Sequence, residues 1–306
     1  MSIELLIEME EEIYHYPVMY REVIEWLEIK NKKIIVDCTI GVGSCALKFF
    51  EIMPKNSLLI GIDKDGDSLE VCRQRLKEFE DRLILIKDDF SNLDKILKRL
   101  EIDKIDAIFF DLGLSTYQLS RAERGFSFLK EGLLDMRMDR DSFLCAYDLV
   151  NNLSERKLTK IFKKYGEEYY ARRVAHLITE KRKKYPLSTT FQLVEIVNQA
   201  IPYRRRQRIH PATKIFQALR IVVNRELECL QEALPKAISF LKKGARLGVI
   251  SFHSLEDRIV KHTFRDFSSK GILEILTKKP LVASLKEREE NLSSRSAKLR
   301  VAEKIE

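Results

Sequence analysis

Four short apolar runs in the first 113 residues are each closed by an aspartate. They are Ile34–Asp37, Leu58–Asp63, Leu83–Asp88 and Ile105–Asp111. Between them, apolar residues recur with a helical period in Ala46–Met53, Ser68–Phe79 and Leu93–Leu100. This alternation predicts βαβ units around a buried parallel sheet. Because ligands bind at the carboxyl ends of such strands, the four aspartates mark the edge where we expect a ligand.

The alternation stops after the fourth run. Residues 112–142 show little periodicity, and a loop of this length in a compact domain is usually functional. Residues 147–201 have a helical pattern with no strand candidate, and a long helix is predicted over 211–230. Pro235 marks a break or the start of a second helix. Residues 246–252 then predict a buried strand, and 272–276 and 298–303 are candidate edge strands.

The simplest architecture is one α/β domain interrupted by a helical insertion. The sheet domain is predicted to consist of residues 1–119 and 211–306, and the insertion of residues 120–210. We find no internal repeat and no low-complexity tract. The predicted fold class is therefore a Rossmann-like sheet that carries an inserted all-helical domain.

The first apolar run leads into a glycine-containing turn, Asp37-Cys38-Thr39-Ile40-Gly41-Val42-Gly43-Ser44-Cys45. Its two glycines allow a tight turn and a close approach to a ligand, and the helix that follows points its amides at that ligand. Asp63, twenty positions after Gly43, ends the next strand. A carboxylate there can accept hydrogen bonds from the ribose hydroxyls of an adenosine. A structural role for Asp63 in the following turn is the alternative.

Both NAD and S-adenosylmethionine fit this turn. Asp37 favours S-adenosylmethionine, because it can receive the charged amino group of the methionine moiety and would repel a pyrophosphate. Asp111, which ends the fourth strand, favours it as well. A carboxylate there can accept a hydrogen bond from a poorly nucleophilic exocyclic amine and stabilise its developing positive charge. Asp111 is therefore the candidate catalytic residue, with a strand cap as the alternative.

Composition indicates a partner and a compartment. The formal net charge is +8 and the pI is about 9.1. This charge favours nucleic acid over a membrane as partner, although a lysine-rich proteome would raise the pI as well. No apolar run approaches the ~20 residues of a membrane helix, and the N-terminus lacks the pattern of a signal peptide. The five cysteines have no metal or redox spacing. We expect a cytoplasmic protein without a metal site.

Two groups of residues are candidates for contact with a nucleic-acid substrate. Phe126, Asp135 and Arg137 lie in the long loop, where an apolar wall and polar groups suit a flipped base. A loop whose arginine and aspartate pair with each other is the alternative. Arg204 and Arg205 belong to a cluster of four arginines next to an aromatic residue. That combination suits phosphate contact and base stacking.

His253 follows the predicted strand 246–252 and faces the ligand edge of the sheet. It is interpreted either as an active-site wall residue that orients the loop or the base, or as a structural histidine. Its neighbours Glu256 and Asp257 do not form a metal-binding or hydrolase motif with it.

Several longer strings resemble one known family. They are His15-Tyr16-Pro17-Val18, Asp111-Leu112-Gly113-Leu114-Ser115, Gln118-Leu119, Arg124-Gly125-Phe126-Ser127-Phe128, Leu134-Asp135-Met136-Arg137-Met138-Asp139, Tyr165-Gly166-Glu167-Glu168, His210-Pro211-Ala212-Thr213, Phe216-Gln217-Ala218-Leu219-Arg220, Ser251-Phe252-His253-Ser254-Leu255-Glu256-Asp257-Arg258 and Ser294-Arg295-Ser296-Ala297-Lys298-Leu299-Arg300. In this order, over nearly the whole chain, they resemble the bacterial 16S ribosomal RNA (cytosine-N4) methyltransferase family, known as RsmH or MraW.

The resemblance implies a class I methyltransferase fold with an inserted helical domain and S-adenosylmethionine as cofactor. It implies the N4 amine of a decoding-centre cytosine in 16S rRNA (position 1402 in the usual RNA numbering) as acceptor, within the small ribosomal subunit. Cofactor contacts in the family fall on positions occupied here by Gly43, Ser44, Cys45, Asp63, Phe90, Asp111 and Gln118.

The chain departs from the family pattern in two places. Ser44-Cys45 replaces the usual Gly-His, and Asn291-Leu292 replaces Asn-Pro. The backbone amides of the turn remain, so we expect cofactor binding to survive the first change.

An rRNA methyltransferase that acts in rRNA processing is the favoured function. The alternatives are an NAD-dependent oxidoreductase with a helical substrate domain and a non-catalytic ribosome-assembly factor on the same fold. The sequence leaves open the oligomeric state (a homodimer included), the assembly stage of the RNA substrate and the group that takes the N4 proton.

Overall fold

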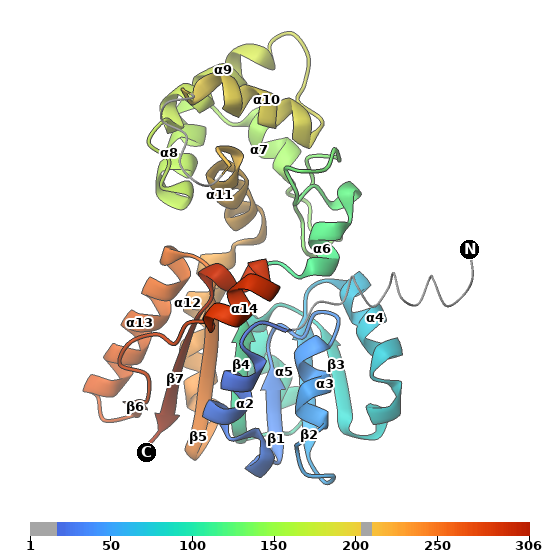
Figure 1. The fold of residues 1–306 in the computed structure, drawn as a ribbon, viewed down its shortest axis with the longest axis vertical. Coiled ribbons are helices and arrows are strands. Elements are labelled where there is room, and N and C mark those ends of the chain that lie inside the picture. Colours follow the sequence, from blue (N-terminus) through green and yellow to red (C-terminus); the bar gives the residue numbers. More distant parts are fainter. Residues whose placement is uncertain (1–16, 203–209) are drawn as a thin grey trace. The chain divides into compact units, whose positions relative to one another are not determined.

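The computed structural model describes residues 17–202 and 210–306 (Figure 1). The chain divides into two compact units, one made of residues up to Ser115 together with Leu227–Glu306, the other of Thr116–Glu226. The insertion was expected at 120–210; its boundaries differ because the helix after residue 210 packs against helices of the insertion. His15 and the arginines Arg204, Arg205, Arg206 and Arg208 lie outside the described residues.

A seven-stranded sheet forms the first unit and confirms the predicted α/β class (Figure 1). The strands are β1 (Ile34–Asp37), β2 (Leu58–Asp63), β3 (Leu83–Lys87), β4 (Ile105–Asp111), β5 (Leu241–Ser251), β6 (Leu273–Ile275) and β7 (Lys298–Lys304). Their order is β3-β2-β1-β4-β5-β7-β6. Neighbours pair in parallel except β7, which runs antiparallel to both β5 and β6.

Successive strand residues face opposite sides of the sheet, and each side has its own core. On one side, Val36, Ile60 and Ile108 pack with the helices α5 (Leu93–Arg99), α12 (Glu226–Phe240) and α13 (Ser254–Ser269). On the other, Ile35, Leu59 and Phe109 pack with the helices α2 (Tyr20–Leu27), α3 (Ser44–Phe50) and α4 (Gly66–Arg75). The near-continuous apolar runs of the sequence thus reflect burial on both faces.

Short elements complete the description of this unit. They are the helix α14 (Leu285–Glu290) and the 3-10 helices η1 (Ile29–Asn31), η2 (Lys77–Arg82), η3 (Phe90–Asn92) and η6 (Leu292–Ser296). Within the described ranges, no helix combines the length and the apolar composition needed to cross a membrane.

The second unit is helical, as predicted for the insertion. It contains α6 (Thr116–Ser120), η4 (Ala122–Arg124), α7 (Ala146–Asn152), α8 (Glu155–Gly166), α9 (Ala171–Lys181), α10 (Thr190–Ala200) and α11 (Ala212–Asn224). α8 packs against both α9 and α11. The amphipathic pattern of these helices supplies the core, with Leu158, Phe162, Val174 and Leu219 fully buried.

Buried polar side chains hold the long loop of this unit in place. Nη2 of Arg124 donates to the carbonyl oxygens of Arg137 at 3.0 Å and Met138 at 2.9 Å. The side-chain amide of Asn224 donates to the carbonyl oxygen of Met136 at 2.8 Å and accepts from the backbone N–H of Met138 at 2.7 Å. The weakly periodic segment is therefore an ordered structure with its own internal bonds.

The interpretation of Pro235 as a helix break or helix start is wrong. The break falls at Arg225, which has a left-handed φ of 51°, and α12 then continues through Pro235. Leu230, Leu234 and Ile238 bury one face of α12 against the sheet, and this burial outweighs the hydrogen bond that proline removes. Two strand ends also differ from the prediction: β3 stops one residue before Asp88, and β5 begins at Leu241, before residue 246.

Candidate functional site

Three carboxylates lie at the carboxyl ends of three neighbouring strands. Asp37 ends β1 and pairs in register with Gly61 of β2 and Phe109 of β4. Asp63 and Asp111 lie two residues further along those strands, on either side of the turn that follows β1. The structure thus brings together three of the acids that the hydrophobic pattern placed at strand ends.

Burial raises the pKa of all three carboxyl groups, to about 7 for Asp37, about 6 for Asp63 and about 8 for Asp111. Nearby negative charge adds to the effect, because Asp63 acts on Asp37, while Asp37 and Glu256 act on Asp111. Oδ1 of Asp111 is buried and has no hydrogen-bond partner among the described residues. Such a cluster is stabilised by a cationic ligand and repels an anionic one.

Thr39 joins the ends of β1 and β4. The ladder between these strands ends where the backbone N–H of Cys38 donates to the carbonyl oxygen of Phe109. Beyond that point the backbone N–H of Asp111 donates to Oγ1 of Thr39 at 2.7 Å. Oδ1 of Asp37 accepts from the backbone N–H of Thr39 at 3.0 Å and lies 3.5 Å from its hydroxyl. Sequence reasoning missed Thr39, although a hydroxyl residue two positions after a strand-end aspartate is a turn signal.

Asp63 also holds the glycine turn itself. Its Oδ2 accepts from the backbone N–H of Gly41 at 2.9 Å, and its Oδ1 accepts from that of Asp65 at 2.9 Å. The structural alternative for Asp63 is thus present. It does not preclude a ligand, because each carboxylate oxygen can accept a further hydrogen bond.

Arg75 of α4 clamps the turn at the position where the family pattern differs. Its Nη1 donates to the carbonyl oxygen of Val42 at 2.6 Å and to Oγ of Ser44 at 3.1 Å. The neighbouring Cys45 is buried, and burial raises the pKa of its thiol well above the usual value. Ser44 therefore gains a partner for its hydroxyl, whereas Cys45 is a neutral apolar side chain rather than a nucleophile.

Phe90 begins η3, three residues after the last residue of β3. Its ring is buried and meets the ring of Phe110 edge to face, with centroids 5.5 Å apart. Nζ of Lys64 lies 5.8 Å from the Phe90 centroid and pairs with Asp89 at 2.6 Å. Phe90 is thus a packed wall at the strand ends, fixed before any ligand binds.

The described candidate residues of the second unit are two buried side chains and one ion pair. Gln118 of α6 and Phe126 are buried. Asp135 and Arg137 form a two-point ion pair, with Nε to Oδ1 at 2.8 Å and Nη2 to Oδ2 at 2.7 Å. For this pair the structure shows the alternative foreseen from the sequence, a loop that pairs internally.

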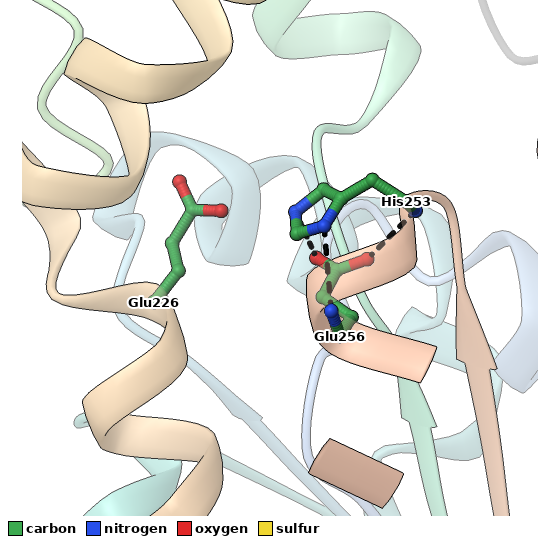
Figure 2. A group of neighbouring side chains, drawn as sticks. All are labelled: Glu226, His253 and Glu256. Atoms are coloured by element: carbon green, nitrogen blue, oxygen red, sulfur yellow. Dashed lines mark hydrogen bonds and ion pairs between the residues drawn. The ribbon is translucent and has the colours of Figure 1, made fainter. Parts of the chain in front are cut away.

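His253 caps helix α13, as Figure 2 shows. Its Nδ1 accepts from the backbone N–H of Glu256 at 3.3 Å, and its Nε2 lies 3.2 Å from Oε1 of the same residue. Figure 2 also draws Glu226, whose carboxylate is bound by Arg220 at 2.8 and 2.9 Å. Although these three side chains are of metal-ligating types, ion pairs and a helix cap account for their positions.

The sheet order and the acidic strand ends define a class of protein. A seven-stranded sheet with a single antiparallel strand next to its edge, a glycine turn after β1 and carboxylates at the ends of β1, β2 and β4 define a class I S-adenosylmethionine-dependent methyltransferase. The site fits that cofactor, because three acids whose pKa values are raised by desolvation and a buried, unpartnered carboxylate oxygen of Asp111 suit a cationic ligand.

Comparison with known families confirms the resemblance seen in the sequence. The model of the MraW methylase family matches residues 12–305, and the chain belongs to that family. Three similar proteins carry the name Ribosomal RNA small subunit methyltransferase H. That of Thermotoga neapolitana is 52% identical and the match covers 96% of this chain and 97% of the relative. Those of a Sulfurihydrogenibium species and Clostridium botulinum are 48% and 43% identical, each over 96% of this chain and 100% of the relative.

Proposed function

We propose that the protein methylates the N4 amine of the decoding-centre cytosine at position 1402 of 16S rRNA, using S-adenosylmethionine. The observation that carries the proposal is similarity along the whole chain, at 43–52% identity, to proteins named Ribosomal RNA small subunit methyltransferase H. Membership of a methylase family argues against the NAD-dependent alternative. The proposed compartment is the cytoplasm, where the small subunit is assembled. All residues invoked belong to one chain, so the proposal does not require a homodimer.

Asp111 is proposed as the catalytic residue. The exocyclic amine of cytosine is a weak nucleophile, because its lone pair is delocalised into the ring. When bound, S-adenosylmethionine supplies an electrophilic methyl group. The unpartnered Oδ1 of Asp111 is suited to accept a hydrogen bond from the amine, which localises the lone pair and stabilises the positive charge that develops on nitrogen. Thr39 fixes this carboxylate through the backbone of Asp111.

The residues proposed to hold the cofactor come from the strand ends. Gly43, Ser44 and Cys45 would offer backbone groups, Asp63 a carboxylate to the ribose, and Phe90 a ring face to the adenine. Gln118 completes the set implied by the family pattern. The observed geometry supports Asp63 and Asp111 most directly, because both lie beside the glycine turn.

The second unit is proposed to recognise the RNA. Residues 116–226 contain 23 lysines and arginines and 12 aspartates and glutamates, a net charge of +11. The rest of the chain has 32 and 35 respectively, a net charge of −3. All exposed phenylalanine, tyrosine and tryptophan side chains of the described residues also belong to this unit, namely Phe143, Tyr147, Tyr169, Tyr185 and Phe191. Cations together with exposed rings are typical of surfaces that bind single-stranded RNA.

Substrate roles for the remaining candidates stay predictions within this proposal. Phe126, Asp135 and Arg137 would act through the ordered shape of their loop, since the last two pair with each other. His253 would act by fixing the start of α13 through Glu256, whose negative charge raises the pKa of Asp111. Arg204 and Arg205 would contact phosphates.

The test is methyl transfer from labelled S-adenosylmethionine to small subunits taken from a strain that lacks the enzyme. We expect label on N4 of the cytosine at position 1402 after nucleoside mapping, and label elsewhere or nowhere would reject the assignment. Asp111→Asn should abolish transfer yet remain folded. If this variant restored every ribosome phenotype in cells, the protein would act as a non-catalytic assembly factor.

A further inference from the structure

The turn between α8 and α9 is a closely packed, hydrogen-bonded structure that the proposed chemistry does not use. It contains the string Tyr165-Gly166-Glu167-Glu168. A Cβ on Gly166 would lie 2.5 Å from the carbonyl oxygen of Lys214, so only glycine lets α8 approach α11 this closely. Glu167 has a left-handed φ of 48°, and the backbone N–H of Glu168 donates to the carbonyl oxygen of Phe162 at 3.1 Å. These bonds close α8 and set the direction of the next residues.

This turn presents one aromatic ring to solvent. The side chain of Tyr169 is 86% exposed. Its ring meets that of Tyr170 edge to face, with centroids 5.1 Å apart. Tyr170 is held in turn, because its backbone N–H donates to Oε1 of the buried Glu168 at 2.8 Å. Tyr169 is thus an exposed ring on a support that is already ordered.

Four exposed cations flank the ring within eleven residues of chain, and they are Lys163, Lys164, Arg172 and Arg173. None of the four has an acidic partner among the described residues, and Lys164 instead lies over the Tyr165 ring at 4.7 Å. Of the two acids of the segment, Glu168 is buried and Glu167 is exposed. The outer surface of this turn therefore combines an exposed aromatic ring with an excess of positive charge.

We propose that the α8–α9 turn is a stacking platform for an unpaired base of the RNA substrate, with Tyr169 under the base and the four cations beside its phosphates. The inference rests on the proposed function for the identity of the RNA. A ring face and cations suit single-stranded RNA, whose bases are available for stacking. A protein partner fits less well, because Tyr169 is the only large apolar side chain of α8, α9 and their turn that is exposed.

The experiment measures binding and turnover with the full-length protein. Tyr169→Ala should raise KM for small subunits about tenfold, because a stacked base contributes substantially to affinity. It should leave kcat and the Kd of S-adenosylmethionine within twofold of the original values. Tyr169→Phe keeps the ring and should behave like the unmodified protein. Leu285→Ala removes a similarly exposed apolar side chain, 78% exposed on α14, and is the matched control.

Filter binding to protein-free 16S rRNA separates the possible outcomes. We expect Tyr169→Ala to lose the same factor in affinity for this RNA as for the subunits. A loss confined to intact subunits would indicate a ribosomal protein partner and overturn the proposal. Equal losses for Tyr169→Phe and Tyr169→Ala would overturn it too, since the hydroxyl and not the ring would then matter. Because this assay needs no methyl transfer, it gives an answer even if the proposed reaction fails.

The salt dependence of RNA binding tests the role of the cations separately. Replacing Arg172 and Arg173 together by alanine should reduce the slope of log K against log salt by about 1.4, at about 0.7 for each lost phosphate contact on single-stranded RNA. An unchanged slope would show that these side chains do not contact phosphates and would overturn that half of the proposal.

Discussion

At the scale of single residues, the raised pKa of Asp111 should make the rate of the proposed reaction depend on pH. An ionised carboxylate is a stronger acceptor for the amine than the neutral acid and stabilises the developing positive charge, and the pKa of Asp111 in the free protein is about 8. We therefore expect kcat/KM for S-adenosylmethionine, which reports the protein without its cofactor, to increase as pH is raised from 6.5 to 8.5. A pH–rate profile measures this, and a flat profile over that range would contradict the proposed role.

The same shift predicts an effect of pH on stability. Because the folded state holds the Asp111 proton more tightly than the unfolded chain, this group contributes stability that is complete below the unfolded pKa, near 4. That contribution is lost as pH rises through about 8. The melting temperature of the cofactor-free protein should fall from pH 5 to pH 9, and fall less in Asp111→Asn. Since a cationic ligand offsets the buried charges, S-adenosylmethionine should raise the melting temperature more at pH 8.5 than at pH 6.

Thr39 gives a second test at this scale. Thr39→Val keeps the shape of the side chain but leaves the backbone N–H of Asp111 without its acceptor. We expect a loss of about 1–3 kcal/mol in the free energy of unfolding, and weaker binding of S-adenosylmethionine because Asp111 is no longer held. Urea unfolding and isothermal titration measure the two effects. Thr39→Ser retains the hydroxyl and should be as stable and bind the cofactor as tightly as the original protein. If both variants behaved equally, the hydroxyl of Thr39 would not be what holds Asp111.

At the scale of elements, the turn between β1 and α3 depends on two glycines in different ways. Gly41 and Gly43 both have a positive φ, of 53° and 79°. A Cβ on Gly41 would have no atom nearer than 3.9 Å, apart from its own chain neighbours, whereas one on Gly43 would lie 2.8 Å from both Sγ of Cys72 and Cδ1 of Leu76. These two substitutions therefore separate the cost of the backbone conformation from the cost of a clash.

Gly41→Ala should destabilise the protein by about 1–2 kcal/mol, the cost of a left-handed alanine. Gly43→Ala should cost ~1–3 kcal/mol more, because Cys72 and Leu76 are buried and cannot move aside. Chemical denaturation of both variants checks the difference. If Gly41→Ala lowered the free energy of unfolding more than Gly43→Ala, the contact of Gly43 with Cys72 and Leu76 would not be the main constraint on this turn.

The elements themselves were predicted unevenly, for physical reasons. β1, β2 and β4 begin and end where the apolar runs predicted, because strands buried on both faces leave a continuous apolar signal. The end of α11 was not predicted, because Arg225 takes the left-handed conformation although no glycine or proline at this position indicates a helix end. Pro235 was misjudged because its penalty is a local effect and the burial that offsets it is tertiary.

At the scale of the whole molecule, the charge is divided between the two units. The net charge of +11 in residues 116–226 predicts that RNA binding weakens steeply with salt. We expect affinity for small subunits to fall at least tenfold between 50 and 200 mM salt. The Kd of S-adenosylmethionine should change by less than twofold, because its proposed ligands are buried or half-buried and therefore poorly screened. Parallel titrations measure both, and a salt-independent RNA affinity would contradict recognition by charge.

The sequence by itself determined the sheet, the edge at which its ligand is proposed to bind and the acids at that edge. These follow from local periodicity and from the rule that parallel strands expose their carboxyl ends together. Tertiary structure decided how those acids are held and what they can do. Thr39 bonds Asp111 across 72 positions of chain and Arg75 bonds Ser44 across 31, while burial by distant elements sets the pKa values. The sequence allowed Asp135 and Arg137 either to face a substrate or to pair with each other, and only the tertiary structure shows that they pair.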